Sequence, residues 1–107
     1  MLEEMLNKWR KTSTFRLKGH YTILKRVFNE PPRSDIRWGK IEDLLKALKA
    51  EVHPGLGDSM RIRLNNVIGD VPTPIGRDRP ATKGTVREIR YILKKAGVTP
   101  ERVQEFL

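Results

Sequence analysis

The stretch Met60-Arg61-Ile62-Arg63-Leu64 alternates strictly between an apolar residue and an arginine. Side chains of a β-strand point alternately to the two faces of a sheet, so this pattern predicts a strand with one buried and one basic face. Asn65 and Asn66 follow, and asparagine tolerates the backbone conformation of a tight two-residue hairpin turn. We therefore expect a hairpin whose second strand is residues 67–71, preceded by a short strand at residues 50–53.

Apolar residues at helical spacing flank this predicted sheet in the sequence. Before it, one apolar stripe consists of Ile41, Leu44, Leu45 and Leu48, and after it another consists of Val86, Ile89, Ile92 and Leu93. The second stripe predicts a helix over residues 85–96, started by the capping-box spacing of Thr85 and Glu88 and stopped by Gly97. The expected class is α+β, a small three-stranded antiparallel sheet packed by helices.

Shorter helices are expected towards the two ends of the chain. One covers residues 1–10, one covers residues 21–29 and ends at Pro31 and Pro32, and one begins at Thr99-Pro100-Glu101. We divide the chain into an N-terminal helical extension (1–18), a main domain (19–98) and a C-terminal short helix (99–107). Most aromatic residues stand at helical or anchoring positions, so the sequence favours a core role for them: Trp9, Phe15, Tyr21, Phe28, Trp38, Tyr91 and Phe106.

The charge balance points to a polyanionic partner. The 107 residues include 22 Lys and Arg against 13 Asp and Glu, a formal net charge of +9. Such an excess attracts polyanions over long range, so RNA or DNA is the favoured partner, while an acidic protein or an anionic membrane surface stays possible. The chain has no cysteine and no apolar run of the roughly 20 residues that a membrane span needs, and its first ten residues lead us to expect no secretion signal. We therefore expect a cytoplasmic protein without a membrane segment.

The candidate binding residues are basic. Arg61 and Arg63 share one strand face, which could grip phosphates bidentately or could be an ordinary solvated face. Further basic residues occupy the loop after the third strand and the start of the last long helix, a place suited to phosphate: Arg77, Arg79, Lys83, Arg87 and Arg90. For these too, ordinary surface charge is the alternative.

His53, at the end of the first strand and beside a Gly-rich loop, is the candidate general base, the alternative being an exposed loop histidine without a role. His20 is better explained as a cap or solvent contact. The two histidines are far apart in the sequence, so no metal site is expected.

Four stretches between Gly19 and Val98 resemble a known family in their order and spacing. They are residues 24–31, residues 34–48, residues 50–52 leading to residues 61–65, and residues 83–90 followed by Leu93 and residues 96–98. Together they are similar to the HicA toxin family in its longer variant. The resemblance implies a double-stranded-RNA-binding-like fold, translation-independent cleavage of mRNA without a cofactor, and a neutralising antitoxin partner of the HicB type.

The histidines of that family have no counterpart here. The matching stretches read Gly57-Asp58-Ser59-Met60 and Pro72-Thr73-Pro74-Ile75-Gly76. RNA cleavage needs a group that moves a proton near neutral pH. Two hypotheses therefore stay open: an mRNA interferase that uses His53 or a neighbour, and a catalytically inactive RNA- or protein-binding module on the same fold.

Overall fold

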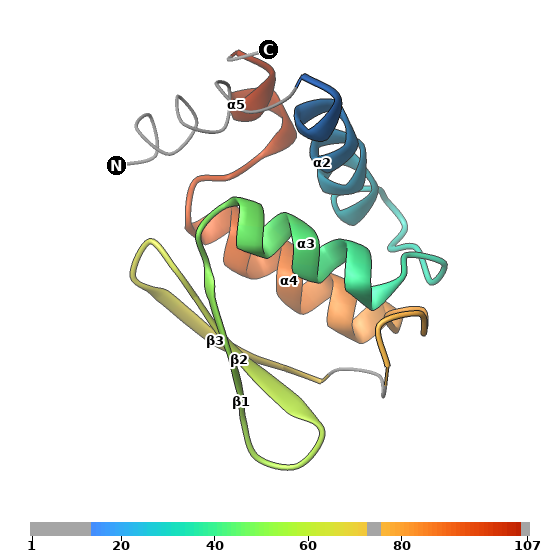
Figure 1. The fold of residues 1–107 in the computed structure, drawn as a ribbon, viewed down its shortest axis with the longest axis vertical. Helices are drawn as coiled ribbons and strands as arrows, with labels where there is room; N and C mark the ends of the chain where they lie inside the picture. The colour runs from blue at the N-terminus through green and yellow to red at the C-terminus, as the bar shows by residue number, and fades with distance from the viewer. Residues whose placement is uncertain (1–13, 73–75, 106–107) are drawn as a thin grey trace.

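The computed structural model describes residues 14–72 and 76–105, with side chains from residue 19 onward (Figure 1). The elements follow in the order α2 (Thr14–Val27), α3 (Trp38–Ala47), β1 (Glu51–Pro54), β2 (Ser59–Leu64), β3 (Val67–Pro72), α4 (Lys83–Lys95) and α5 (Pro100–Gln104). The expected α+β class is confirmed. The helix expected over residues 1–10 lies outside the described residues.

The three strands form one antiparallel sheet in the order β1-β2-β3. Asn65 and Asn66 have φ values of 49° and 69°, the left-handed conformation of a two-residue hairpin turn, so the predicted hairpin is confirmed. Within β2, Ile62 and Leu64 are buried whereas Arg61 and Arg63 are exposed, as the alternation predicts.

Helices cover only one face of this sheet among the described residues. α3 contacts β1 and α4 contacts β3, while α2 lies on the other side of these two helices and contacts α3, α4 and α5 (Figure 1). The result is three layers: the sheet, then α3 with α4, then α2 with α5. The opposite face of the sheet, which we call the open face, carries Glu51, His53, Arg61, Arg63, Ile68 and Asp70.

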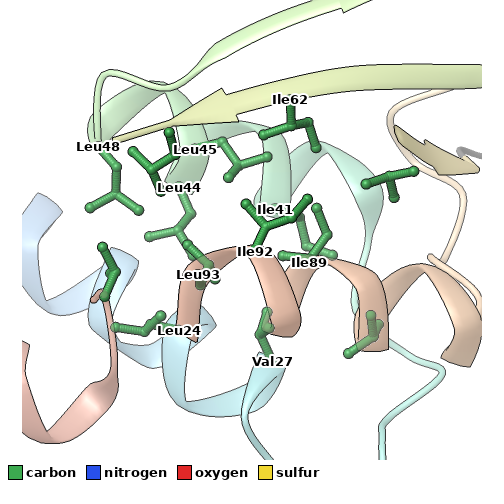
Figure 2. Close-up of a cluster of buried hydrophobic side chains, with 14 of the residues drawn as sticks. Leu24, Val27, Ile41, Leu44, Leu45, Leu48, Ile62, Ile89, Ile92 and Leu93 are labelled. Carbon is green, nitrogen blue, oxygen red and sulfur yellow. The ribbon is translucent and has the colours of Figure 1, made fainter. Parts of the chain in front are cut away.

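One continuous core joins the three layers. Ile62 of the sheet lies against the middle layer, and Leu24 and Val27 of α2 meet the middle layer from the other side (Figure 2). The predicted stripes of α3 and α4 are confirmed as buried and fill the space between: Ile41, Leu44, Leu45, Leu48, Val86, Ile89, Ile92 and Leu93. Ile36, which precedes α3, and Trp38, the first residue of α3, are also buried.

Gly69 lets α4 approach the sheet closely. It pairs with Ile62 on the covered face of the sheet. A Cβ atom placed on Gly69 would lie 2.7 Å from Cδ1 and 3.0 Å from Cγ1 of Ile92, which is 1 % exposed. Any side chain at this position would therefore push against the packed face of α4.

Two predicted helix starts are wrong. α2 begins at Thr14, not near Tyr21, because the weak helix propensity of Gly19 and the threonines is outweighed by the packing of α2 against other helices. α2 ends at Val27, two residues before the predicted end at Asn29. α4 is capped by Thr82, whose Oγ1 accepts a hydrogen bond from the backbone N–H of Thr85 at 3.1 Å. Thr85 already lies in the first turn, where it is buried and donates to the carbonyl of Pro72.

The predicted end of this helix is confirmed. Gly97 has a φ of 84°, and the N–H of Val98 donates to the carbonyl of Leu93 at 2.8 Å, the bond that closes a glycine-ended helix. α3 ends in the same way, but there Lys49 takes the left-handed conformation with a φ of 65°. The chain thus turns sharply into β1 and, later, away from the sheet towards α5.

Candidate nucleic-acid interface

The outward side of α4 carries a line of basic residues. The apolar core residues of α4 define its inward side. Residues that are three or four positions apart lie on the same face of a helix, so the basic residues with this spacing form one outward line. We call this line the α4 stripe: Lys83, Arg87, Arg90 and Lys94. Lys83, Arg87 and Lys94 are exposed, and none of the three forms an ion pair with another described residue. The stripe therefore keeps its positive charge.

A shallow depression of about 350 Å³ lies beside the stripe. We call it the α4 depression; its lining residues are Glu30, Pro32, Arg87, Arg90, Tyr91 and Lys94. The side chain of Arg90 is only 16 % exposed and forms an ion pair with the carboxylate of Glu30. This pair ties the α2–α3 connector to α4 and neutralises the one carboxylate in the lining.

Tyr91 is not a core residue, so its predicted core role is wrong. It is 56 % exposed at the α4 depression, and Nζ of Lys95 lies over its ring, 5.2 Å from the centroid. The physical reason is its place on the helix: residue 91 is two positions from both Ile89 and Leu93, which point into the core, so its side chain points outward. By contrast, Trp38 is buried, and Tyr21 and Phe28 pack against the core as predicted.

The open face of the sheet is charge-neutral. Arg61 and Arg63 point the same way, as predicted, but each meets a carboxylate on a neighbouring strand. Nε of Arg61 donates to Asp70 at 3.1 Å and thereby raises the pKa of the guanidinium, and Nη1 of Arg63 lies 3.9 Å from Glu51. These exposed pairs contribute little stability, yet they lower the positive potential that would attract a phosphate.

His53 lies on this open face rather than near α4. It is exposed and pairs in register with Arg61, which in turn pairs with Asp70, so a histidine, an arginine and an aspartate form one row across the three strands. The sheet separates this row from the α4 stripe. His20 is half-buried on α2.

Arg77 holds its own loop against α3. Its guanidinium forms ion pairs with Glu42 and with Asp43, the latter at 2.9 Å, and donates to the carbonyl of Gly39 at 3.3 Å. The two carboxylates raise the pKa of the Arg77 guanidinium. In addition, the backbone N–H of Gly39 donates a hydrogen bond to the carbonyl of Arg77 at 2.9 Å. Arg79 lies on the same loop, where its carbonyl accepts a hydrogen bond from the N–H of Trp38. Its side chain forms no ion pair with another described residue.

The basic residues predicted from the sequence therefore fall into three groups. Arg61 and Arg63 lie on the open face, Arg77 and Arg79 lie on the loop against α3, and the remaining three lie on the α4 stripe: Lys83, Arg87 and Arg90. Elsewhere, Arg33 is neutralised by Asp35, whose pKa it lowers to about 2 by hydrogen bonding. Of the three groups, only the α4 stripe combines several cations with few acidic partners.

No protein family model, curated protein or solved structure matches this chain. Within the part of the chain that the structure describes, no group of three His, Asp or Glu side chains could hold a metal ion. None of the described helices has both the length and the apolar character that crossing a membrane requires.

Sequence reasoning missed Tyr91 and Glu30 as site residues. Tyr91 could have been found by placing residue 91 on the helix, since its neighbours at 87 and 94 are both basic and lie on the same side. Glu30 carried no such signal, because it joins α4 only through the tertiary packing of α2.

Proposed function

We propose that this protein binds RNA as a HicA-like protein, and that the α4 stripe is its main contact with the phosphates. The observation that carries the proposal is the line of cations on one helix face, three of them exposed and without acidic partners among the described residues. The net charge of +9 adds long-range attraction to this local surface.

The dimensions of the stripe suit a nucleic acid. Lys83 and Lys94 are eleven residues apart on one helix, which corresponds to roughly 16 Å along the axis. A duplex carries one negative charge for roughly every 1.7 Å of its axis, so a stripe of this length spans several phosphates. The α4 stripe is thus a linear cation array facing a linear anion array.

The resemblance to HicA toxins extends this proposal to the natural target and partner. It favours mRNA as the bound RNA and a HicB-type antitoxin as a neutralising protein. A cytoplasmic location suits both, and it suits a chain without cysteine.

The test compares two variants that each remove two positive charges. Arg87→Gln/Lys94→Gln changes the α4 stripe, and Arg61→Gln/Arg63→Gln changes the open face, so the net charge stays matched. Affinity for a fluorescein-labelled single-stranded RNA is measured by anisotropy between about 50 and 200 mM salt. The stripe variant is expected to weaken binding by about tenfold or more at ~0.1 M salt, and to lower the log–log salt slope by about 1 to 1.5.

The open-face variant serves as the control and is expected to stay within about twofold of the unmodified protein, since its arginines are already paired. Equal losses in the two variants would mean that only net charge matters and that α4 is not the binding surface. No RNA binding by the unmodified protein at low salt would remove the proposal altogether.

A second candidate function is RNA cleavage on the open face of the sheet. The observation that favours it is the row of His53, Arg61 and Asp70. An exposed imidazole can take the proton of a ribose 2′-hydroxyl, and an adjacent arginine can stabilise charge on the attacked phosphate. The 2′-oxygen then bonds to phosphorus while the bond from phosphorus to the 5′-oxygen breaks, and the 5′-oxygen leaves with a proton from the imidazolium or from water. For that, Arg61 would have to exchange its carboxylate partner for the phosphate.

Cleavage is tested with purified protein, several RNAs and low salt. If the second candidate is right, fragments with 2′,3′-cyclic phosphate ends form, and they are absent with His53→Ala but present with His20→Gln. Induction in bacteria is then expected to arrest growth in a manner that depends on His53. Intact RNA after incubation with the unmodified protein would leave binding as the function.

A further inference from the structure

We propose that the α4 depression takes an unpaired RNA nucleotide, with the base stacked on Tyr91 and the flanking phosphates held by Arg87 and Lys94. The inference rests on the proposed RNA binding and goes further, because it names single-stranded RNA as the preferred substrate class. It combines three features of the described residues: an exposed aromatic ring, two cations beside that ring, and a hollow lined by all three.

The ring of Tyr91 is available to a ligand. More than half of the residue is exposed, although it stands on a helix whose other large apolar residues are buried. An aromatic side chain in solvent offers a flat apolar face on which any base can stack. Nζ of Lys95 lies over one face of the ring, so the surface that the ring offers to a base is its opposite face.

The cations stand at the right places around the ring. Arg87 precedes Tyr91 by four residues and Lys94 follows it by three, so both lie on the same side of the helix as the ring. Lys95 adds a third positive charge, 5.2 Å from the ring centroid. A stacked base thus has cations on both sides along the helix axis, where its own phosphodiester chain enters and leaves.

The wall of the depression is fixed before any ligand arrives. Arg90 is mostly buried and is held by Glu30, which anchors the α2–α3 connector beside α4. Because Arg90 cancels the charge of Glu30, the lining keeps the two positive charges of Arg87 and Lys94. Binding therefore has to order the exposed side chains of Arg87 and Lys94, whereas Arg90 is already held in place.

The geometry favours an unpaired nucleotide over a duplex. In a duplex the base faces are covered by their neighbours, and A-form RNA presents mainly phosphates and 2′-hydroxyls to a protein. A ring in a hollow of about 350 Å³ can reach a base face only where the strand is unstacked. A duplex can still contact the α4 stripe through its phosphates, but it gains nothing from Tyr91.

The test uses two fluorescein-labelled probes, an unstructured oligouridylate and an RNA duplex of about 16 base pairs. Tyr91→Ala is expected to weaken binding of the single strand by about 5- to 100-fold, to leave its salt slope unchanged, and to alter duplex binding by less than about twofold. Tyr91→Phe is expected to recover most of the lost affinity because it restores the ring. Ile68→Ala is the matched control, since it truncates another exposed apolar residue, on the open face.

The outcomes separate this inference from the proposed function. If Tyr91→Ala leaves the single strand unaffected while Arg87→Gln/Lys94→Gln weakens both probes, the nucleotide site is overturned and RNA binding by α4 stands. If Tyr91→Ala weakens both probes alike, the ring supports the binding surface only indirectly, and the site is again overturned. Binding of polyglutamate as tight as that of the single strand would show a general polyanion surface. If neither RNA probe binds the unmodified protein, the proposed function itself fails.

Discussion

Replacing Leu24 with alanine is expected to lower the free energy of unfolding by about 2 to 5 kcal/mol. Leu24 is fully buried, and its side chain joins α2 to the layer formed by α3 and α4 (Figure 2). Truncation removes the transfer free energy of the lost methyl groups and leaves a cavity that the surrounding helices fill only in part. Urea unfolding followed by circular dichroism measures the change.

The Leu24 variant also tests whether α2 belongs to the main folding unit. A single cooperative transition that moves to lower urea would show that the outer helix layer and the sheet unfold together. Arg26→Ala, on the exposed side of the same helix, is the control and should stay within about 0.5 kcal/mol. A Leu24 variant as stable as this control would mean that α2 is an appendage.

A side chain at Gly69 is the second change with a large expected effect. Gly69→Val is expected to destabilise the protein by about 1 to 3 kcal/mol, because its Cβ would lie 2.7 Å from Cδ1 of Ile92, and this buried side chain would have to shift. Ile92→Val removes that methyl group. In the double variant part of the loss should return, as a coupling free energy in a double-mutant cycle.

Ile68→Val, one residue away on the open face, is the comparison for the glycine variant. It changes an exposed strand residue without facing α4, and a shift near zero is expected. A Gly69→Val variant as stable as the unmodified protein would contradict this prediction. So would a double variant whose loss of stability equals the sum of the two single losses, because the contact between residue 69 and Ile92 would then not explain the effect of a side chain at residue 69.

The hairpin could be predicted from the sequence because every signal in it is local. The alternation of residues 60–64 fixes which side chains are buried, and the two asparagines fix the turn. The start of α4 could not be predicted in the same way, because the sequence offers two possible N-cap threonines. Thr82 can cap the backbone N–H of Thr85, and Thr85 has Glu88 at the spacing of a capping box. The choice between them depends on the buried hydrogen bond from Thr85 to the carbonyl of Pro72, which is a tertiary contact.

The candidate site was predicted in its residue types but not in its arrangement. The predicted two-residue turn at Asn65 and Asn66 already implies a register that places Asp70 opposite Arg61, but whether Arg61 binds that carboxylate or a phosphate depends on how the two side chains lie in the folded sheet. The same holds for Arg77, whose partners lie 34 and 35 residues away on α3. The helical face of α4, by contrast, follows from spacing alone, which is why Arg87 and Arg90 could be assigned to one face.

A three-stranded sheet has two edge strands, and an unpaired edge is a template for a strand of another molecule. β1 is four residues long and ends on Pro54, and β3 ends on Pro72 after Gly69 and Asp70. Short length, proline, glycine and charge all disfavour the addition of a further strand. Many copies held close together along one polyanion would thus gain little from joining their sheets, and we expect them to separate again as monodisperse protein when salt releases them.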